Sequence, residues 1–220
     1  TLDRWVQGHS QQRHSRGFFM SQAAELADLR ALRRALRRQR RRLSAGDRQA
    51  AAQAAAAQLL RALPKPPRRL GLYLPDDGEM DPTPLAEALG SARTQKFLPR
   101  INPFRRRPRL SFGHPSPLCP GAFGIAAPCT GLRPSWTLDW VLIPLVAFSR
   151  TGHRLGRGGG YYDASFAPTL PGQPFRLGVA YAFQECPPWV PASHDVTLDA
   201  IVTETGLWRC SPRAWRLLPG

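Results

Sequence analysis

The sequence predicts an α/β sandwich with a largely parallel sheet. Short apolar runs with the character of strands alternate with segments of helical periodicity, which is the pattern of this fold class. The strongest run, DWVLIPLVAF at residues 139–148, is continuously apolar, as expected for a strand whose sheet is covered on both faces. The chain has 220 residues, of which 42% are hydrophobic, and this is enough for one domain with a hydrophobic core.

Two helices are expected at the start of the domain. Between residues 23 and 43, leucines recur at steps of three, four or seven and form one apolar stripe. Arginines cover the other face, and we interpret the run Arg37 to Arg42 as solvated. Ser44 and Asp47 fit a capping box that begins a second helix, which ends at the prolines of segment 64–67.

The remaining elements are expected in the order strand, helix, then several strands. The run RLGLYL (69–74) predicts a strand followed by the turn PDDG, and PTPLAEAL (82–89) predicts a helix with proline in its first turn. The segment 99–128 is rich in Pro and Arg and predicts long, partly irregular connections. Further strands are expected at KFLP (96–99), RLSF (109–112), RLGVAYAF (176–183) and TLDAIVTET (197–205).

The two ends of the chain differ from the segment between them. Residues 1–19 lack the apolar core of a secretory signal, and the sequence from Met20 looks like a natural start. We therefore expect a disordered leader at 1–19, an α/β domain at 20–210 and a C-terminal tail at 211–220.

The spacing of the cysteines and the length of the apolar runs are used to predict the cellular location of the protein and its relation to membranes. Cys119, Cys129, Cys186 and Cys210 are widely spaced, with no C-x-x-C pair and no histidine at the spacing of a metal finger. We expect reduced thiols in a cytoplasmic protein, in preference to a disulfide framework or a zinc site. No apolar run approaches the roughly 18 to 20 residues of a membrane span, so we expect no membrane association.

The net charge is strongly positive. Lys and Arg number 31 against 15 Asp and Glu, a formal charge of +16, and clustered arginines can neutralise phosphates. Only Lys65 and Lys96 are lysines, and the excess of alanine and proline points to a compositional bias along the whole chain. Charge alone therefore leaves open an arginine-rich module that binds RNA or polyphosphate without catalysis.

A glycine-rich segment, GHRLGRGGGYYD (152–163), follows the strongest strand. Ligands of such sheets bind outside the carboxyl ends of the strands, where this segment lies. The P-loop pattern fails because no lysine followed by Ser or Thr is present, and the pattern G-x-G-x-x-G fails because Tyr161 replaces its last glycine. A general phosphate-binding loop flanked by arginines remains, and the alternative is a glycine-rich surface turn.

The longer run DWVLIPLVAFSRTGHRLGRGGGYYD closely resembles the signature of the 5-formyltetrahydrofolate cyclo-ligase family, also called 5,10-methenyltetrahydrofolate synthetase. The resemblance extends from about Leu29 to Glu204, through GEMD, FLPR, FGI and HD…LDAIVTE. It implies a single-domain, three-layer α/β/α sandwich that is Rossmann-like. It also implies ATP-driven, Mg²⁺-dependent closure of 5-formyltetrahydrofolate to 5,10-methenyltetrahydrofolate by a monomer that requires no nucleic acid.

The resemblance also implies roles for individual residues. Arg154, Arg157 and Tyr161 would be catalytic, and Asp163 and Asp195 would bind magnesium. The folate would contact Leu74, Glu79, Arg157, Gly158, Gly159, Gly160 and Tyr161. The residues implied for ATP are Arg30, Arg33, Arg154, Leu155, Gly156, Arg157, Gly158, Gly159, Gly160, Tyr161 and Tyr162.

The sequence departs from the family pattern at three positions. Leu29 stands where many relatives have a lysine for ATP, and Arg30 is near enough to replace it. Ala127 stands where the family commonly has a glutamate, and Gly159 occupies a second basic position of the loop. The first two departures leave open a family member that binds ATP and folate without efficient turnover.

Overall fold

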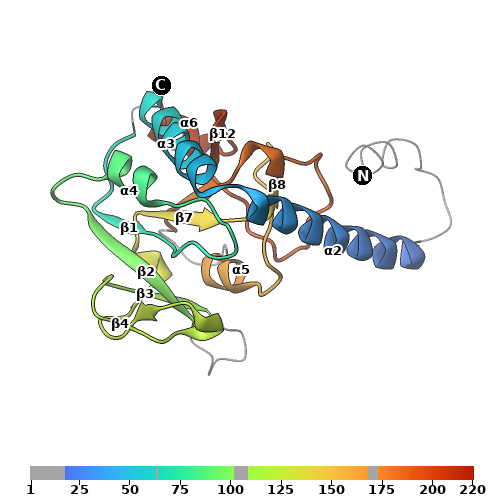
Figure 1. The fold of residues 1–220 in the computed structure, drawn as a ribbon, viewed down its shortest axis with the longest axis horizontal. Helices are drawn as coiled ribbons and strands as arrows, with labels where there is room; N and C mark the ends of the chain where they lie inside the picture. The colour runs from blue at the N-terminus through green and yellow to red at the C-terminus, as the bar shows by residue number, and fades with distance from the viewer. Residues whose placement is uncertain (1–17, 63, 102–108, 168–172) are drawn as a thin grey trace.

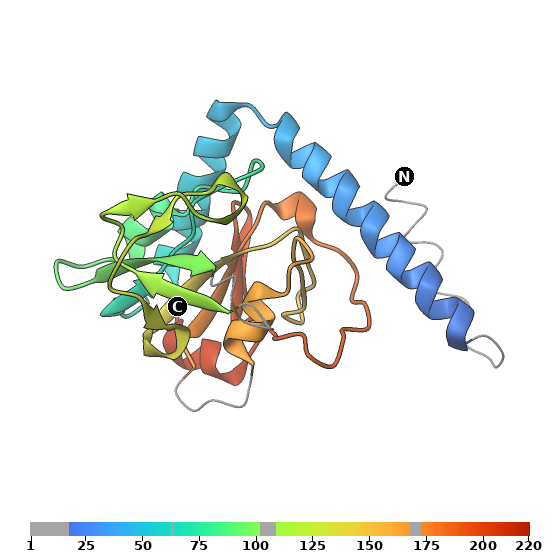
Figure 2. The same cartoon turned by 90° about the horizontal axis from the view of Figure 1, so that it is seen from below.

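The computed structural model describes residues 18–62, 64–101, 109–167 and 173–220 (Figure 1). Most of the expected leader lies outside the described residues. Its last two residues begin the first labelled helix, α2 (Phe18–Arg42), so this helix starts before Met20. Figure 2 shows the N-terminal end of α2 projecting away from the body of the molecule, while the other end leads through a short connection into the next helix.

A central sheet of eight strands organises the domain. The strand order is β12-β11-β10-β7-β1-β2-β3-β6. The five strands from β11 to β2 are parallel, and β12, β3 and β6 pair in antiparallel fashion at the edges. The bounds are β1 (Arg69–Gly71), β2 (Gln95–Ile101), β3 (Leu110–Gly113), β6 (Arg133–Pro134), β7 (Trp140–Pro144), β10 (Phe175–Val179), β11 (Ala200–Thr203) and β12 (Gly206–Arg209).

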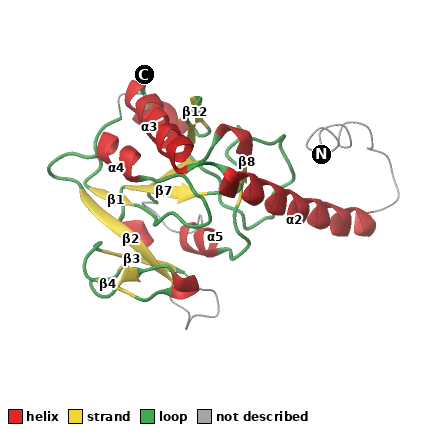
Figure 3. Cartoon of the chain, viewed as in Figure 1, coloured by secondary structure: helices red, strands yellow, loops and turns green. Residues whose placement is uncertain are grey.

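Helices and connections cover both faces of this sheet (Figure 3). Trp140 and Leu142 of β7 point to a core shared with α3 (Ala45–Arg61), α4 (Thr83–Leu89) and α6 (Pro212–Leu217). Val141 and Ile143 point to the opposite core, which includes Phe166 of the short helix α5 (Tyr161–Phe166). The alternation follows from the two-residue period of a strand. The predicted fold class, an α/β sandwich with a mostly parallel sheet in one domain, is confirmed.

The helix starts follow the local sequence. Ser44 caps α3, since its side chain accepts a hydrogen bond from the backbone N–H of Asp47, as the capping pattern predicts. At the other end of the chain, α6 lies within the segment expected as a tail. Ala214 and Leu218 are fully buried in the core beside α3, so this segment is part of the folded domain.

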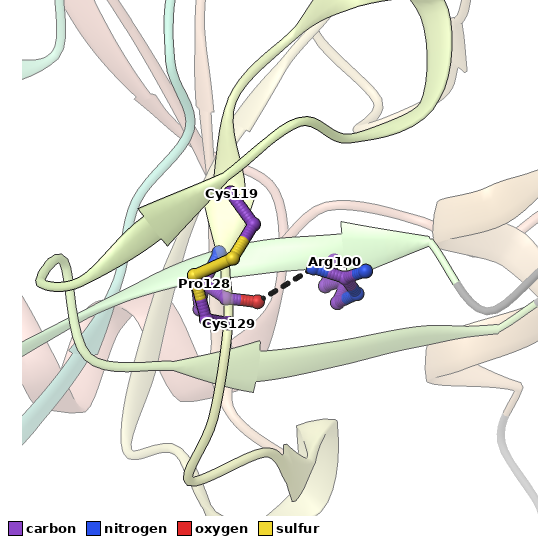
Figure 4. Close-up of a disulfide and its surroundings, with 4 residues drawn as sticks. All are labelled: Arg100, Cys119, Pro128 and Cys129. Carbon is purple, nitrogen blue, oxygen red and sulfur yellow. Dashed lines mark hydrogen bonds between the residues drawn. A yellow bond between two sulfur atoms is a disulfide. The ribbon is translucent and has the colours of Figure 1, made fainter.

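A disulfide corrects the expectation of four reduced thiols. Cys119 and Cys129 are bonded, with 5.3 Å between their Cα atoms (Figure 4). Antiparallel pairing of β4 (Leu118–Cys119) with β5 (Ala127–Pro128) brings them together, which their spacing alone does not indicate. Cys186 and Cys210 are free thiols, and burial raises the pKa of Cys186 to about 11 and that of Cys210 to about 12.

Two short strands outside the main sheet follow β7. β8 (Ala147–Phe148) pairs with β9 (Arg154–Leu155), which lies within the glycine-rich segment. Among the described helices, none is long and apolar enough to cross a membrane.

Candidate functional site

A cleft of about 620 Å³ lies at the carboxyl edge of the parallel strands. Its volume falls in the range of small-molecule sites. Its walls come from α2, the turn after β1, the loop before β5, and the glycine-rich segment after β9. This is the edge at which ligands bind in open α/β sheets, so the predicted location agrees with the observed cleft.

The glycine-rich loop forms one wall of the cleft. Gly158 has φ of 102° and Gly160 has φ of 64°, which is a left-handed backbone that side chains with a Cβ rarely adopt. No atom lies within 4 Å of where a Cβ would stand at either position. Glycine is therefore required there by backbone conformation, and the loop backbone remains open to a ligand.

Three arginines lie around this loop. Arg33 of α2 donates from Nε to the carbonyl oxygen of Gly156 at 3.0 Å, and burial lowers the pKa of its guanidinium. Arg154 donates to Oδ1 of Asp163 at 2.6 Å and also to the carbonyl oxygen of Val196. The Arg154 side chain is nearly buried, and these two hydrogen bonds fix its orientation.

Arg157 reaches across the cleft from the same loop. Its Nη1 donates to Oδ2 of Asp76 at 2.5 Å, and both side chains are about 40% exposed. Burial alone would lower the pKa of Arg157, but the bond to Asp76 and the charge of Glu79 raise it overall. The loop and the turn after β1 are thereby connected by an ion pair at the mouth of the cleft.

Glu79 is the buried acid of that turn. Its Oε2 accepts a hydrogen bond from the backbone N–H of Asp76 at 3.2 Å, and only 7% of the residue is exposed. Burial raises the pKa of Glu79, although Arg40, the Asp76 N–H and Arg157 partly offset this effect. Leu74 lines the same part of the cleft. A carboxylate here can accept hydrogen bonds from paired N–H donors of a ligand.

Two carboxylates of the cleft are predicted as metal ligands. Asp163 of α5 accepts a hydrogen bond on Oδ1 from the backbone N–H of Val196 at 3.0 Å, which brings the segment of Asp195 beside it. Asp195 also lines the cleft. Within the described ranges, no group of three or more His, Cys, Asp or Glu side chains could enclose a metal ion.

Aromatic side chains face the cleft from two walls. Tyr161 and Tyr162 line it from α5, and burial raises the pKa of the Tyr162 hydroxyl. Phe123, with 72% of its surface exposed and φ of 60°, lies with its ring 6.1 Å from that of Tyr161 in an edge-to-face arrangement. Sequence reasoning did not select Phe123, although it begins the FGI turn on which the family resemblance partly depends.

The structure gathers nearly all the predicted site residues at one cleft. Arg30 is the exception, because it is exposed on α2 and is not among the described residues that line the cleft. Ala127 is one of the lining residues, and Leu29 packs against a small apolar cluster instead. The predicted residues that line the cleft are Arg33, Leu74, Glu79, Arg154, Leu155, Gly156, Arg157, Gly158, Gly159, Gly160, Tyr161, Tyr162, Asp163 and Asp195.

The interpretation of Arg37 to Arg42 as a solvated face is wrong for part of the run. Arg40 is only 1% exposed, and Arg37 is half-buried and lines the cleft. The carboxylate of Asp77 attracts them, since Arg37, Arg40 and Arg41 all form ion pairs with it. Arg38 and Arg42 are exposed, as expected.

Comparison with known proteins gives consistent results. The sequence model described as the 5-formyltetrahydrofolate cyclo-ligase family matches residues 25–204. The 5-formyltetrahydrofolate cyclo-ligase of Escherichia coli K12 is 32% identical over 182 residues, covering 79% of this chain and 98% of that protein. The Saccharomyces cerevisiae protein of the same name is 32% identical over 162 residues, covering 63% of this chain and 77% of that one.

Solved structures agree with the sequence comparison. The 5,10-methenyltetrahydrofolate synthetase of Aquifex aeolicus superposes with a TM-score of 0.65 at 29% identity, covering 83% of this chain and 92% of that one. The synthetase of Mycoplasma pneumoniae gives a TM-score of 0.60 at 24% identity, covering 80% and 99%, and shares the fold. The family that the glycine signature predicts is thus confirmed, and this chain belongs to the 5-formyltetrahydrofolate cyclo-ligase family of enzymes.

Proposed function

We propose that this protein cyclises 5-formyltetrahydrofolate to 5,10-methenyltetrahydrofolate, with hydrolysis of ATP to ADP and phosphate and with Mg²⁺ required. One observation carries the proposal beyond family membership. A single cleft contains a glycine loop with two arginines, suited to phosphates, and a buried carboxylate, suited to the N–H donors of a pterin. Both substrates can therefore occupy one site.

In this proposal the nucleotide binds along the glycine loop. The open backbone at Gly158 and Gly160 supplies N–H donors to the phosphates, and Arg154 and Arg157 supply charge-assisted hydrogen bonds. Arg33 supports the loop from α2 through its bond to the Gly156 carbonyl. Arg30 remains a predicted ATP contact that would require its exposed side chain to turn toward the cleft.

The folate binds opposite the loop. Glu79 accepts hydrogen bonds from the amino and ring N–H groups of the pterin, and Leu74 packs beside it. Tyr161 follows Gly160 at the start of α5 and lines the cleft, where it can pack against the formyl group or the ring. The ring of Phe123 extends the aromatic surface and suits the p-aminobenzoate part of the substrate.

The chemistry needs an activated formyl oxygen, because that oxygen is a poor leaving group. It attacks the γ-phosphorus of ATP, and the bond from that phosphorus to ADP breaks. N10 of the folate then attacks the formyl carbon, the carbon–oxygen bond breaks with release of phosphate, and N10 loses its proton. Arg154 and Arg157 stabilise the charge on the phosphoryl group during transfer.

Asp163 and Asp195 suit a magnesium ion that arrives with ATP. Mg²⁺ is held in enzymes by one or two carboxylates together with waters and substrate phosphates, so two acids are sufficient. Both hydrogen bonds to Asp163 use Oδ1, which leaves Oδ2 for the cation. When bound, Mg²⁺ neutralises charge on the phosphates.

The cytoplasmic location and the monomeric state of this protein stay predictions.

The test is a direct assay of the purified protein. With 5-formyltetrahydrofolate, ATP and Mg²⁺, we expect the near-ultraviolet absorption of the methenyl product to appear, and to be lost when ATP or Mg²⁺ is omitted. No product under saturating conditions would overturn the proposal. Binding of RNA that weakens steeply with salt and ignores folate would favour the non-catalytic alternative.

Two departures support a second candidate, a member that binds both substrates without efficient turnover. Leu29 replaces a lysine and packs into an apolar cluster, and Ala127 offers no carboxylate to the cleft that it lines. Binding of 5-formyltetrahydrofolate measured beside turnover separates this candidate from the active enzyme.

A further inference from the structure

Arg40 is an arginine of α2 whose side chain is almost completely buried. Only 1% of its surface is exposed, and each of its three nitrogens has a partner. Nε donates to the carbonyl oxygen of Asp77 at 2.9 Å, and Nη1 donates to the carbonyl oxygen of Leu145 at 3.3 Å. Arg40 therefore joins α2 to the connections that follow β1 and β7.

The third nitrogen of Arg40 faces two carboxylates. Nη2 donates to Oδ2 of Asp77 at 2.9 Å and lies 3.8 Å from Oε1 of Glu79. These two acids are 9% and 6% exposed, so little water screens the charges. A buried cation is costly unless it is paired, and this arrangement supplies the pairing.

The turn that carries Glu79 depends on these contacts. Asp77 has φ of 54°, a left-handed backbone that costs energy for a residue with a side chain. Burial alone would raise the pKa of Asp77, but hydrogen bonds from Arg37 and Arg41 and the charge of Arg40 hold it well below its usual range. Ion pairs with a permanently charged acid thus hold the turn in its uncommon conformation.

We propose that Arg40 is a positioning residue for folate recognition, which directs the Glu79 carboxylate into the cleft and, from 3.8 Å away, favours its charged form. It does so in two ways, by fixing the turn through Asp77 and by placing a positive charge beside Glu79. This inference rests on the proposed role of Glu79 in binding the pterin. Arg40 itself is buried behind the turn and does not line the cleft within the described part of the chain.

The charges around Glu79 determine what loss of Arg40 should do. Burial raises the pKa of Glu79, the charge of Arg40, the N–H of Asp76 and the charge of Arg157 partly offset this rise, and the nearby Asp76 carboxylate adds to it. Tyr73 and Tyr162 also lie near Glu79, and burial raises the pKa of each hydroxyl, so both are neutral. Without Arg40, the pKa of Glu79 rises further, and the carboxylate becomes protonated at a higher pH.

The first experiment compares Arg40→Met with the wild-type protein in the cyclisation assay across pH. We expect KM for 5-formyltetrahydrofolate to rise about tenfold, KM for ATP to change little, and the acid limb of kcat/KM for the folate to move to higher pH. Arg38→Met is the matched control, because it removes an equal charge from an exposed position on the same helix. It should reproduce the wild-type values.

A double-mutant cycle tests whether Arg40 acts through Glu79. In a Glu79→Gln background there is no carboxylate to hold, so Arg40→Met should add little to the rise in KM. Arg40→Lys keeps the positive charge but loses the planar guanidinium group. KM for the folate should therefore rise less, and the acid limb of the pH profile of kcat/KM should stay near its wild-type position. If loss of the buried charge prevents Arg40→Met from folding, Arg40→Lys replaces it as the variant that tests the role of Arg40.

The outcomes separate this inference from the proposed function. If the wild-type protein forms no methenyl product, or if Glu79→Gln leaves the folate KM unchanged, the proposed function or its folate site is wrong, and the role of Arg40 falls with it. If Glu79→Gln raises KM but the Arg40 variants change neither KM nor the acid limb, only the role of Arg40 is overturned. Equal effects of Arg40→Met with and without Glu79 would also overturn it.

Discussion

Two walls of the cleft face each other and are built in different ways. The glycine wall, residues 156–162, is shaped by backbone conformation and carries charge at Arg157. The disulfide wall, residues 119–129, is closed at its base by Cys119 and Cys129 and presents apolar side chains with Phe123 outermost. Figure 4 shows Arg100 of β2 near the bond, donating to the Pro128 carbonyl oxygen at 2.9 Å.

The shapes of the two walls are thus held by different kinds of constraint, although both walls belong to one site. The glycine wall uses local sequence, because left-handed residues and flanking arginines define its shape and charge. The disulfide wall uses a covalent link, the pairing of β4 with β5 that places Ala127 opposite Cys119, and a hydrogen bond from Arg100 of β2. We expect changes in the first wall to affect phosphate chemistry, and changes in the second to affect stability and folate binding.

The largest effect should come from removing charge from the glycine wall. Arg157→Ala takes away a donor to the transferring phosphoryl group and the ion pair to Asp76, so kcat/KM should fall about 100-fold or more. Steady-state kinetics with varied ATP measure this. Arg150→Ala is the control, because Arg150 is an exposed arginine whose ion pair with Glu185 lies on the surface. Equal losses in both variants would contradict a specific role.

A smaller effect is expected on breaking the disulfide wall. Cys119→Ser with Cys129→Ser opens a loop closed over a sequence separation of 10 residues, which should cost about 2–3 kcal/mol of unfolding free energy. Denaturant unfolding measures the loss, and a reducing agent should lower the stability of the wild-type protein equally. The free thiol of Cys210 provides the control, since Cys210→Ser breaks no disulfide and keeps a hydroxyl in place of the thiol that donates to the carbonyl oxygens of Arg150 and Trp208. A wild-type protein insensitive to reduction would refute this expectation.

The smallest effect concerns backbone conformation in the glycine wall. Gly158→Ala places a Cβ on a residue with φ of 102°, which should lower the unfolding free energy by about 1–2 kcal/mol. Gly156→Ala is the matched control, because its φ is not positive and no atom lies within 4 Å of the added Cβ. Thermal unfolding of both variants provides the comparison. Equal stability would show that the left-handed conformation is not needed.

Local patterns were sufficient to predict much of the fold and of the glycine wall. The continuous apolar run at 139–148 contains the central strand β7, and the capping residues begin α3 where expected. The charged and glycine residues of one contiguous signature lie together at the cleft because they are adjacent in sequence. The same reasoning missed α6, β12 and α5, which are short and stabilised mainly by tertiary packing.

The disulfide wall and Arg40 depend on contacts between distant segments. No spacing rule indicates that the pairing of β4 with β5 brings Cys119 within bonding distance of Cys129. For Arg40 a signal was present, because it follows Leu36 by four residues and precedes Leu43 by three, which places it on the apolar stripe of α2. Its burial needs Asp77, and no local pattern indicates that this acid would meet the helix.

The contacts of α2 also determine when this helix can take its place. Arg33 binds the carbonyl of Gly156, 123 residues later in the chain, and Arg40 binds that of Leu145, 105 residues later. During synthesis, α2 emerges well before either partner exists, and closing such long loops is slow. We infer that α2 is made before these partners but is among the last elements to dock, so the complete cleft forms only near the end of folding.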